Sequence, residues 1–285
     1  MTIWKLVAAL AATAAVFPAN STAQPVAASP QYSYADLADL ADAAPVVLDA
    51  RIRDAIRLEG AQATNLPASK ARFYVEADVL ALIRGAGGSP AKISYVADVP
   101  LDARGRAPKL KKSRVLLLAR PVSGQAGSLQ LVAPDAQLAW SESTDAQLRA
   151  ILTELTAPDS PPRITGVGGA FHTAGTLPGE GETQIFLSTQ TGDPISVIVL
   201  RRPGQAPRWA VALGEIVDEA ARPPQPGTLL WYRLACSLPA RLPAQNLESL
   251  DATQAEIAQA DYRLVREGLG RCVRTRAAQP SSAPR

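Results

Sequence analysis

The stretch from Pro45 to Trp140 constrains the fold of this chain more than any other, because short apolar runs alternate there with loops rich in glycine and proline. The runs are rich in β-branched and aromatic residues, and no gap between them has the length and periodicity of a helix. The predicted strands cover residues 46–58, 71–84, 92–99, 115–119, 129–132 and 137–140. Closely spaced strands of this kind predict a small barrel or sandwich.

In the second half of the first predicted strand, alternate residues form two sets of different character, one set in each register of the strand. One register carries arginines, which indicates a face exposed to solvent. The other carries Ile52, Asp54, Ile56 and Leu58, and we expect it to face the core.

A short helix is predicted just before this strand. Ser33 and Asp36 stand three residues apart, as the two partners of a capping box do. Apolar residues follow at helical spacing until Pro45 ends the helix. We expect this helix to plug one end of the barrel or to pack on its flank.

The order of these elements resembles a known type of barrel. The parts, in order, are a helix, the segments APVVLDARI and RFYVEADVLALIRG, a lysine-bearing loop and the segment RVLLLARPV. This pattern is similar to the netrin-like, oligosaccharide/oligonucleotide-binding (OB) type of barrel. The resemblance covers residues 34–140 and implies a small five-stranded barrel, of a kind found in exported bacterial proteins. Netrin-like inhibitors of metalloproteases place an N-terminal cysteine against the metal. Residues 34–140 contain no cysteine, so that mechanism is not carried over.

The second half of the chain predicts an antiparallel sheet with one helix. Thr144 and Gln147 form a second capping box for a helix of about three turns, which ends in the proline-rich residues 157–162. Four strands and a final helix follow, at residues 183–190, 195–202, 208–213, 228–236 and 251–267. The chain is therefore predicted to be mainly β with flanking helices: an OB-like barrel domain (33–157), then an α+β antiparallel-sheet domain (163–276).

The N-terminus has the pattern of a secretory signal peptide. Lys5 precedes the apolar run Leu6–Phe17, and small residues surround a cleavage position after Ala23. The alternative is a retained membrane anchor, but the run is shorter than the roughly 20 residues that a spanning helix needs. We expect residues 1–23 to be removed and the mature protein to be periplasmic or fully secreted. Residues 24–32 and 277–285 are predicted to be disordered.

The two cysteines are Cys236 and Cys272. In an exported protein an even count predicts one disulfide, which would tie the predicted strand 228–236 to the end of the last helix. The alternatives are two buried thiols or a bridge between molecules. The spacing matches no redox or zinc motif, so we interpret the pair as structural.

Little in the chain points to catalysis. His172 is the only histidine, which excludes a metal site with several histidines, and no G-x-S-x-G motif is present. Glu180 and Glu182 stand close together in a glycine-rich loop, as carboxylates of a hydrolase can. We predict no catalytic residue, no metal and no cofactor, with a hydrolase that uses His172 or the Glu180/Glu182 loop as the alternative.

A run of basic residues without an acid is the strongest candidate for a binding surface. It consists of Arg104, Arg106, Lys109, Lys111, Lys112 and Arg114. The whole chain has a net charge of only +3, so the run is a local asymmetry. Such a loop can contact phosphate or anionic head groups, or it can simply be solvated. The export pattern and the absence of an interleaved aromatic residue disfavour nucleic acid.

The sequence thus predicts a non-catalytic envelope protein that binds a partner protein, an anionic lipid or a polysaccharide through this loop. A structural accessory subunit of an envelope assembly is a further alternative. An exposed apolar patch on the barrel would favour the accessory subunit, whereas a deep pocket that joins His172 to a serine or carboxylate would favour the hydrolase.

Overall fold

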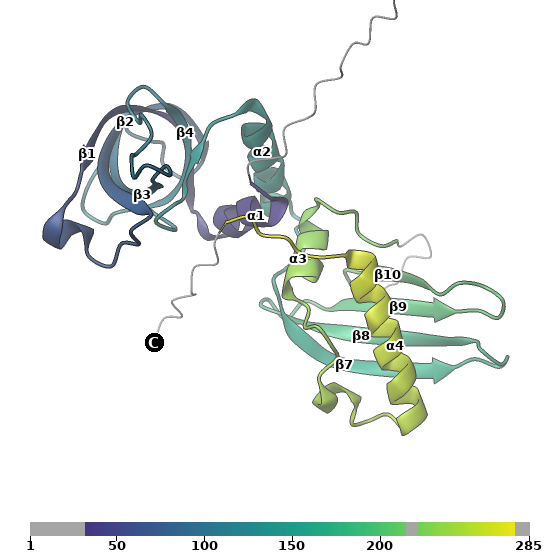
Figure 1. Cartoon of the computed structure of the whole chain (residues 1–285). Coiled ribbons are helices and arrows are strands. Elements are labelled where there is room, and N and C mark those ends of the chain that lie inside the picture. Colours follow the sequence, from purple (N-terminus) through teal and green to yellow (C-terminus); the bar gives the residue numbers. More distant parts are fainter. Residues whose placement is uncertain (1–31, 215–221, 277–285) are drawn as a thin grey trace, which may run out of the picture.

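The computed structural model describes residues 32–214 and 222–276. The predicted signal peptide, residues 24–31 of the predicted N-terminal disorder and the tail 277–285 lie outside these ranges. Figure 1 shows a small barrel and a separate four-stranded sheet, with helices where the two meet.

The first half of the chain forms a closed barrel. Its strands are β1 (Val46–Arg57), β2 (Lys70–Arg84), β3 (Lys92–Pro100), β4 (Arg114–Pro121) and β5 (Ser128–Leu131). The order is β1-β2-β3-β5-β4, and β4 closes the barrel by pairing with β1. Only β3 and β5 are parallel. A short strand, β6 (Gln137–Ala139), pairs with residues 115–117 of β4. The predicted mainly-β, OB-like five-stranded barrel is confirmed.

Strand β1 closes the barrel because it pairs on both sides. Residues 46–51 pair with β4, while the whole strand pairs with β2 through three irregular steps that bend it. Beyond Ile52 only the pairing with β2 continues, so the end of this hairpin projects from the barrel. Ile52 is buried, but Ile56 is 57% exposed. The prediction that this register faces the core as far as Leu58 is therefore wrong at its outer end.

Two helices lie beside the barrel. Helix α1 (Tyr34–Ala43) begins with the predicted capping box between Ser33 and Asp36. Helix α2 (Glu142–Thr156) begins one turn earlier than predicted. Its N-cap is Ser141, whose hydroxyl accepts from the Thr144 N–H at 3.1 Å. Thr144 is buried in the first turn, so its predicted role as the cap is wrong.

The second half forms an antiparallel meander in the order β10-β9-β8-β7. Its strands are β7 (Ile164–Ala174), β8 (Gly181–Thr189), β9 (Ile195–Arg201) and β10 (Arg208–Ala212). The three predicted strands of the meander correspond to β8, β9 and β10, and β7 is the fourth. Helix α4 (Ala252–Leu269) crosses one face of the sheet (Figure 1). The short helices η1 (Gly60–Ala63) and η2 (Ala244–Leu247) lie in connecting loops.

The predicted strand 228–236 is wrong, because this segment is helix α3 (Leu229–Ser237). Thr228 caps it by accepting from the Trp231 N–H at 3.3 Å. Most of its side chains are buried, including the aromatic ones, so the apolar pattern lacks the clear helical period of a surface helix. Aromatic and apolar residues without that period look like a buried strand in sequence.

A single continuous cluster of buried apolar residues runs through the barrel, the helices and one face of the sheet. Cys236 and Cys272 form a disulfide, with their Cα atoms 5.1 Å apart. It joins the end of α3 to the segment after α4, and not a strand to a helix. No helix in residues 32–214 or 222–276 combines the length and the apolar character needed to cross a membrane. The division into two domains near residues 158–162 stays a prediction.

Candidate binding site on the barrel

The predicted basic run lies in the loop between β3 and β4, at one end of the barrel, and nearby acids neutralise part of it. Arg106 pairs with Asp102 at 3.2 Å, and Lys111 lies 3.6 Å from Asp54 of β1. The run itself contains no acid, but Asp102 lies two residues before it in the same loop, and the fold brings Asp54 to it. These two basic residues are therefore partly committed to contacts within the protein.

Arg114 has a structural role. Its guanidinium donates three hydrogen bonds to Asp49, at 2.9, 3.2 and 2.5 Å, and stacks 3.8 Å from the centre of the Trp140 ring. Asp49 is buried on β1, so this pair clamps β1 to the start of β4. Its hydrogen bond to Asp49 raises the pKa of Arg114 above the ordinary value.

Three members of the run keep their charge available. Arg104, Lys109 and Lys112 are exposed, and none forms an ion pair with the residues that the structure describes. Of these, Lys109 is the one that borders a cavity.

That cavity, which we call the end cleft, has a volume of about 520 Å³. It lies where β2 begins, β3 ends and β4 begins, beneath residues 108–113 of the basic loop. Tyr32 and the segment Thr275–Arg276 form its other wall. The charged residues that line it are Lys70, Asp98, Lys109, Arg114, Asp135 and Arg276.

The end cleft is net positive. Arg276 pairs with Asp135 at 2.5 Å, and Asp98 pairs with Arg72 at 2.7 Å. Lys70 and Lys109 have no acidic partner among residues 32–214 and 222–276, so their charges are not cancelled. The side-chain Nε of Arg276 is buried and has no hydrogen-bond partner in the described part of the chain. The cleft therefore offers the two ammonium groups of Lys70 and Lys109 to a ligand.

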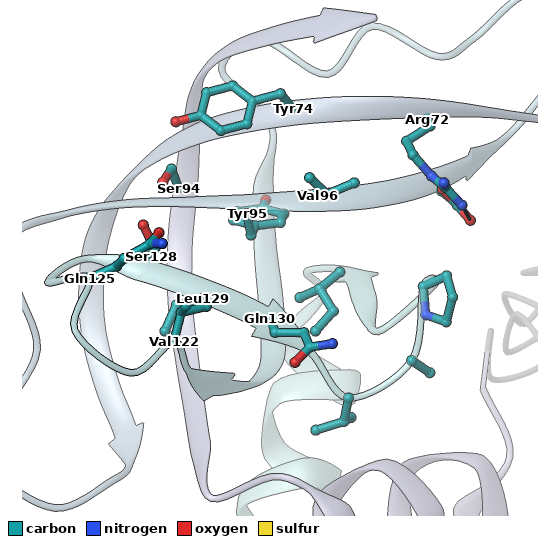
Figure 2. Close-up of a pocket in the computed structure, with 15 residues that line it drawn as sticks. Arg72, Tyr74, Ser94, Tyr95, Val96, Val122, Gln125, Ser128, Leu129 and Gln130 are labelled. Carbon is teal, nitrogen blue, oxygen red and sulfur yellow. Dashed lines mark hydrogen bonds and ion pairs between the residues drawn. The ribbon is translucent and has the colours of Figure 1, made fainter. Parts of the chain in front are cut away.

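A second hollow, the side groove, lies between β3 and β5 and has a volume of about 470 Å³ (Figure 2). Gln125 and Gln130 lie on one side of it, and Tyr74 and Val96 lie on the other. Its only charged lining residues, Arg72 and Asp98, neutralise each other. The side groove is thus polar but uncharged.

An apolar row on the outside of the barrel leads into the side groove. Ile56 of β1 pairs with Tyr74 of β2, which pairs with Val96 of β3. All three side chains are exposed, and two of them are 57% and 43% exposed (Ile56 and Val96). An exposed apolar patch on the barrel is the feature expected of an accessory subunit, and this apolar row is such a patch.

His172 lies in a buried polar chain near the end of β7. Thr183 donates to Asp261 of α4 at 2.6 Å, so its single proton is used there. His172 Nδ1, 2.9 Å from the same hydroxyl, must then be the donor to Thr183. Arg201 donates to the other oxygen of Asp261 at 2.8 Å. All of these groups bind one another, so the chain ties α4 to the sheet.

Glu180 and Glu182 are not brought together with His172. Glu180 accepts from the backbone N–H groups of Thr176 and Leu177, at 3.1 and 3.2 Å, and so closes its own loop. Glu182 accepts from Gln184 at 2.6 Å, on the face of β8 opposite to the one that faces His172. None of these three predicted alternatives lines the end cleft or the side groove.

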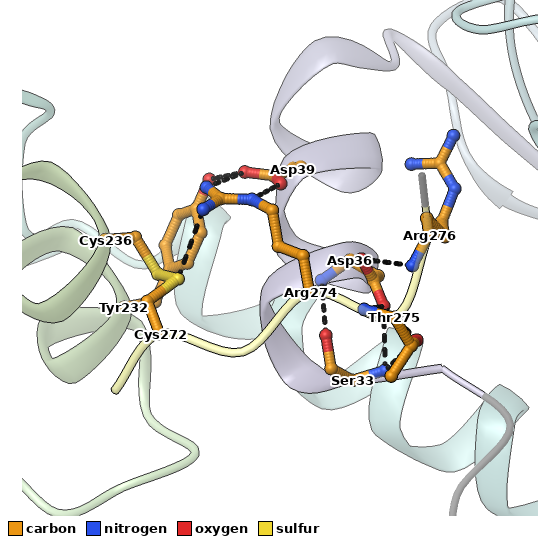
Figure 3. A network of polar contacts seen from close by, with 9 residues as sticks. All are labelled: Ser33, Asp36, Asp39, Tyr232, Cys236, Cys272, Arg274, Thr275 and Arg276. Atoms are coloured by element: carbon orange, nitrogen blue, oxygen red, sulfur yellow. Dashed lines mark hydrogen bonds and ion pairs between the residues drawn. A yellow bond between two sulfur atoms is a disulfide. The ribbon is translucent and has the colours of Figure 1, made fainter. Parts of the chain in front are cut away.

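The sequence interpretation missed an acidic face on α1. Asp36, Asp39 and Asp42 are three residues apart, so they lie along one side of the helix. Asp39 accepts from Arg274 at 2.6 Å and from the Tyr232 hydroxyl at 2.5 Å (Figure 3). The spacing is visible in the sequence, but its partners come from the other end of the chain.

Asp36 holds the segment that follows the disulfide, residues 273–276, which we call the C-terminal strap. Its carboxylate accepts from the N–H groups of Thr275 and Arg276, at 2.9 and 3.2 Å (Figure 3). Asp42 pairs with Arg233 of α3 and with Arg163. The acidic face of α1 thereby positions the wall of the end cleft.

No protein-family model matches the chain, and no curated protein matches it significantly. Within residues 32–214 and 222–276, no three His, Cys, Asp or Glu side chains gather in a way that could hold a metal ion.

Proposed function

We propose that the protein is an exported, non-catalytic binding protein that recognises an anionic component of the cell envelope in the end cleft. The observation that carries the proposal is the pair Lys70 and Lys109, two lysines without acidic partners on a cavity large enough for a head group or a sugar acid. The N-terminal pattern supports export, with the periplasm as the expected location.

The ligand chemistry follows from the donors. Lysines bind phosphate and carboxylate as point charges, and each contributes about 1 kcal/mol near an anionic surface. Two such contacts predict weak binding that falls as the salt concentration rises. An anionic lipid head group and an acidic polysaccharide share this chemistry, so the experiment must compare the two sources.

The first prediction concerns the two free lysines. We expect the mature protein to co-sediment with phosphatidylglycerol vesicles or to bind soluble alginate, and the variant Lys70→Gln/Lys109→Gln to bind at least tenfold more weakly. The loss of two contacts worth about 1 kcal/mol each gives that magnitude. The measurement is the bound fraction across a salt series, with neutral phosphatidylcholine vesicles as the reference.

Lys92→Gln/Arg120→Gln is the matched control. It removes the same charge from exposed positions that do not line the end cleft. Equal binding by both double variants would place the contact outside the cleft. If the unaltered protein binds neither anionic probe at low salt, the proposed function is wrong.

A second candidate function is an accessory subunit that docks a partner protein on the apolar row. Its support is the exposure of Ile56, Tyr74 and Val96 on three neighbouring strands, beside an uncharged groove. Apolar side chains at the centre of a polar surface are typical of protein contacts.

The second prediction tests this candidate in cells. A photo-crosslinking amino acid at position 96 should give a discrete protein adduct, and Tyr74→Asp should remove it, because a charge in the row would be desolvated on docking. The same crosslinker at Lys92, an exposed position on the same strand, is the control. Adducts of equal yield at positions 92 and 96, or none at 96, would exclude a docking role for the row.

A further inference from the structure

The sheet formed by β7 to β10 has one face covered by α4 (Figure 1), and the other face is open over β7 and β8 but partly covered over β9 and β10, where Ile198 and Ala212 are buried. Side chains alternate strictly along β8, where Thr183, Ile185 and Leu187 are buried. The intervening residues point to the other face. On that face Phe171, Phe186 and Leu200 are 53%, 46% and 41% exposed, which is unusual for three large apolar side chains on one small sheet.

The register of the strands fixes how the open face is arranged. Three rows of paired residues cross it from β7 to β10. In this order, the rows are Thr173–Glu182–Leu200–Arg208, Phe171–Gln184–Ile198–Ala210 and Gly169–Phe186–Ser196–Ala212. The two large aromatic residues lie on β7 and β8, and the small residues lie mainly on β9 and β10. Large aromatic side chains therefore lie on one half of this face, and most of the small side chains lie on the other half.

We propose that this open face binds a second copy of the chain, in a two-fold dimer of sheets packed face to face. A two-fold axis parallel to the strands places β7 over β10 of the other copy and β8 over β9. Phe171 then meets Ala210, and Phe186 meets Ser196. Each aromatic ring lies opposite a small residue, so the face is complementary in shape to itself.

The charges on the face are complementary under the same rotation. Glu182 and Arg208 lie in one row, two strands apart, and neither forms an ion pair with another described residue of its own chain. In the dimer Arg208 lies over β7 of the other copy, one strand spacing of about 4.8 Å from the position of its Glu182. Facing sheets lie about 10 Å apart, so with this lateral offset the two backbone positions are about 11 Å apart, which an arginine and a glutamate side chain can span together. The two-fold repeats the contact, which gives two ion pairs at the rim of an apolar centre.

The size of the face sets the strength of the dimer. A four-stranded sheet is about 20 Å wide, and three rows of outward residues extend over about 20 Å, which gives at most roughly 400 Å² per copy, because Ile198 and Ala212 on this face are already buried. Stable complexes bury about 800 Å² per partner. The dimer is therefore weak and depends on protein concentration.

The test is sedimentation velocity of the intact, disulfide-bonded protein from roughly 1 to 500 μM, the range in which a weak interface fills. The mass of the unaltered protein should rise from monomer towards dimer across this range. Phe186→Asp should remain monomeric. Leu80→Asp, which alters a residue 44% exposed on the barrel, should dimerise like the unaltered protein.

Charge reversal tests the orientation of the two copies. Glu182→Arg and Arg208→Glu should each weaken dimerisation about tenfold, and the double variant should restore it, because the swapped charges again face each other. A protein that stays monomeric at 500 μM overturns the proposal. If the double variant dimerises more weakly than both single variants, the two-fold geometry is wrong. If Leu80→Asp and Phe186→Asp lose dimerisation equally, the two copies associate through another surface.

Discussion

Replacing Asp36 with alanine is expected to lower the free energy of unfolding by about 3 kcal/mol, because three backbone N–H donors then lose their acceptor. The Asp36 carboxylate is almost completely buried and accepts from the N–H groups of Ser33, Thr275 and Arg276, at 3.0, 2.9 and 3.2 Å. Each unsatisfied donor costs about 1 kcal/mol or more. Urea unfolding of the oxidised protein measures the change.

The contact between Asp36 and the C-terminal strap is also expected to weaken in acid. Burial acts to raise the pKa of Asp36, but the hydrogen bonds from Thr275 and Ser33 together outweigh it and hold the pKa below the ordinary value. A carboxyl whose pKa is lower in the folded state stabilises fully above its unfolded pKa of about 4, and this contribution is lost as the pH falls through the folded pKa. The pKa of Asp42 is also lowered: burial opposes the shift, and Arg233 and Arg163 outweigh it.

The unfolding midpoint in urea should therefore fall steeply below about pH 4, and Asp36→Asn should make this fall shallower. The control is Asp193→Asn, which changes an exposed carboxyl in a turn. If Asp36→Ala is as stable as the Asp193 variant at pH 7, the strap is not held by this carboxylate. If the pH profile of Asp36→Asn follows that of the unaltered protein, the acid sensitivity comes from other groups.

The barrel could be predicted from sequence because its information is local. The strands from Val46 to Ala139 are short, separated by glycine and proline, and too close together to leave room for helices. The capping box of α1 is likewise a contact between neighbours in sequence. Helix α3 was not predictable in this way, because its burial on several sides removes the periodicity that distinguishes a helix from a strand.

The binding site was predictable only in part, for a related reason. The basic run is visible as a block of sequence, but its neutralisation by Asp49 and Asp54 depends on the pairing of β1 with β4, far apart in the chain. Lys70 precedes the run by more than thirty positions and reaches the same cleft only in the closed barrel. Local sequence therefore identified the charge, and long-range pairing decides which lysines remain free.

Asp261 also depends on partners that are distant in sequence, and its replacement is expected to cause the largest loss of stability. This side chain is fully buried on α4, and it provides the counter-charge for Arg201 of β9 while accepting from Thr183 of β8. Asp261→Asn keeps the shape but leaves a partly buried guanidinium without an opposite charge, which costs about 3–5 kcal/mol. We expect a loss of this size in urea unfolding, whereas Glu256→Gln, at an exposed position of the same helix, should change stability by less than ~0.5 kcal/mol.

A double variant separates the ion pair from simple packing. If the cost of Asp261→Asn comes from the uncompensated charge, then Arg201→Gln/Asp261→Asn should be more stable than Asp261→Asn alone, because no buried charge remains. If the double variant is instead less stable by the sum of the two single losses, each side chain acts through its own packing. His172 gives an independent readout: its Nδ1–H donates to Thr183 only while Thr183 donates to an acceptor on α4. The imidazole resonances of His172 should therefore shift in Asp261→Leu and stay unchanged in Glu256→Gln, because only the first change removes the acceptor on α4 to which the His172–Thr183 chain is bound.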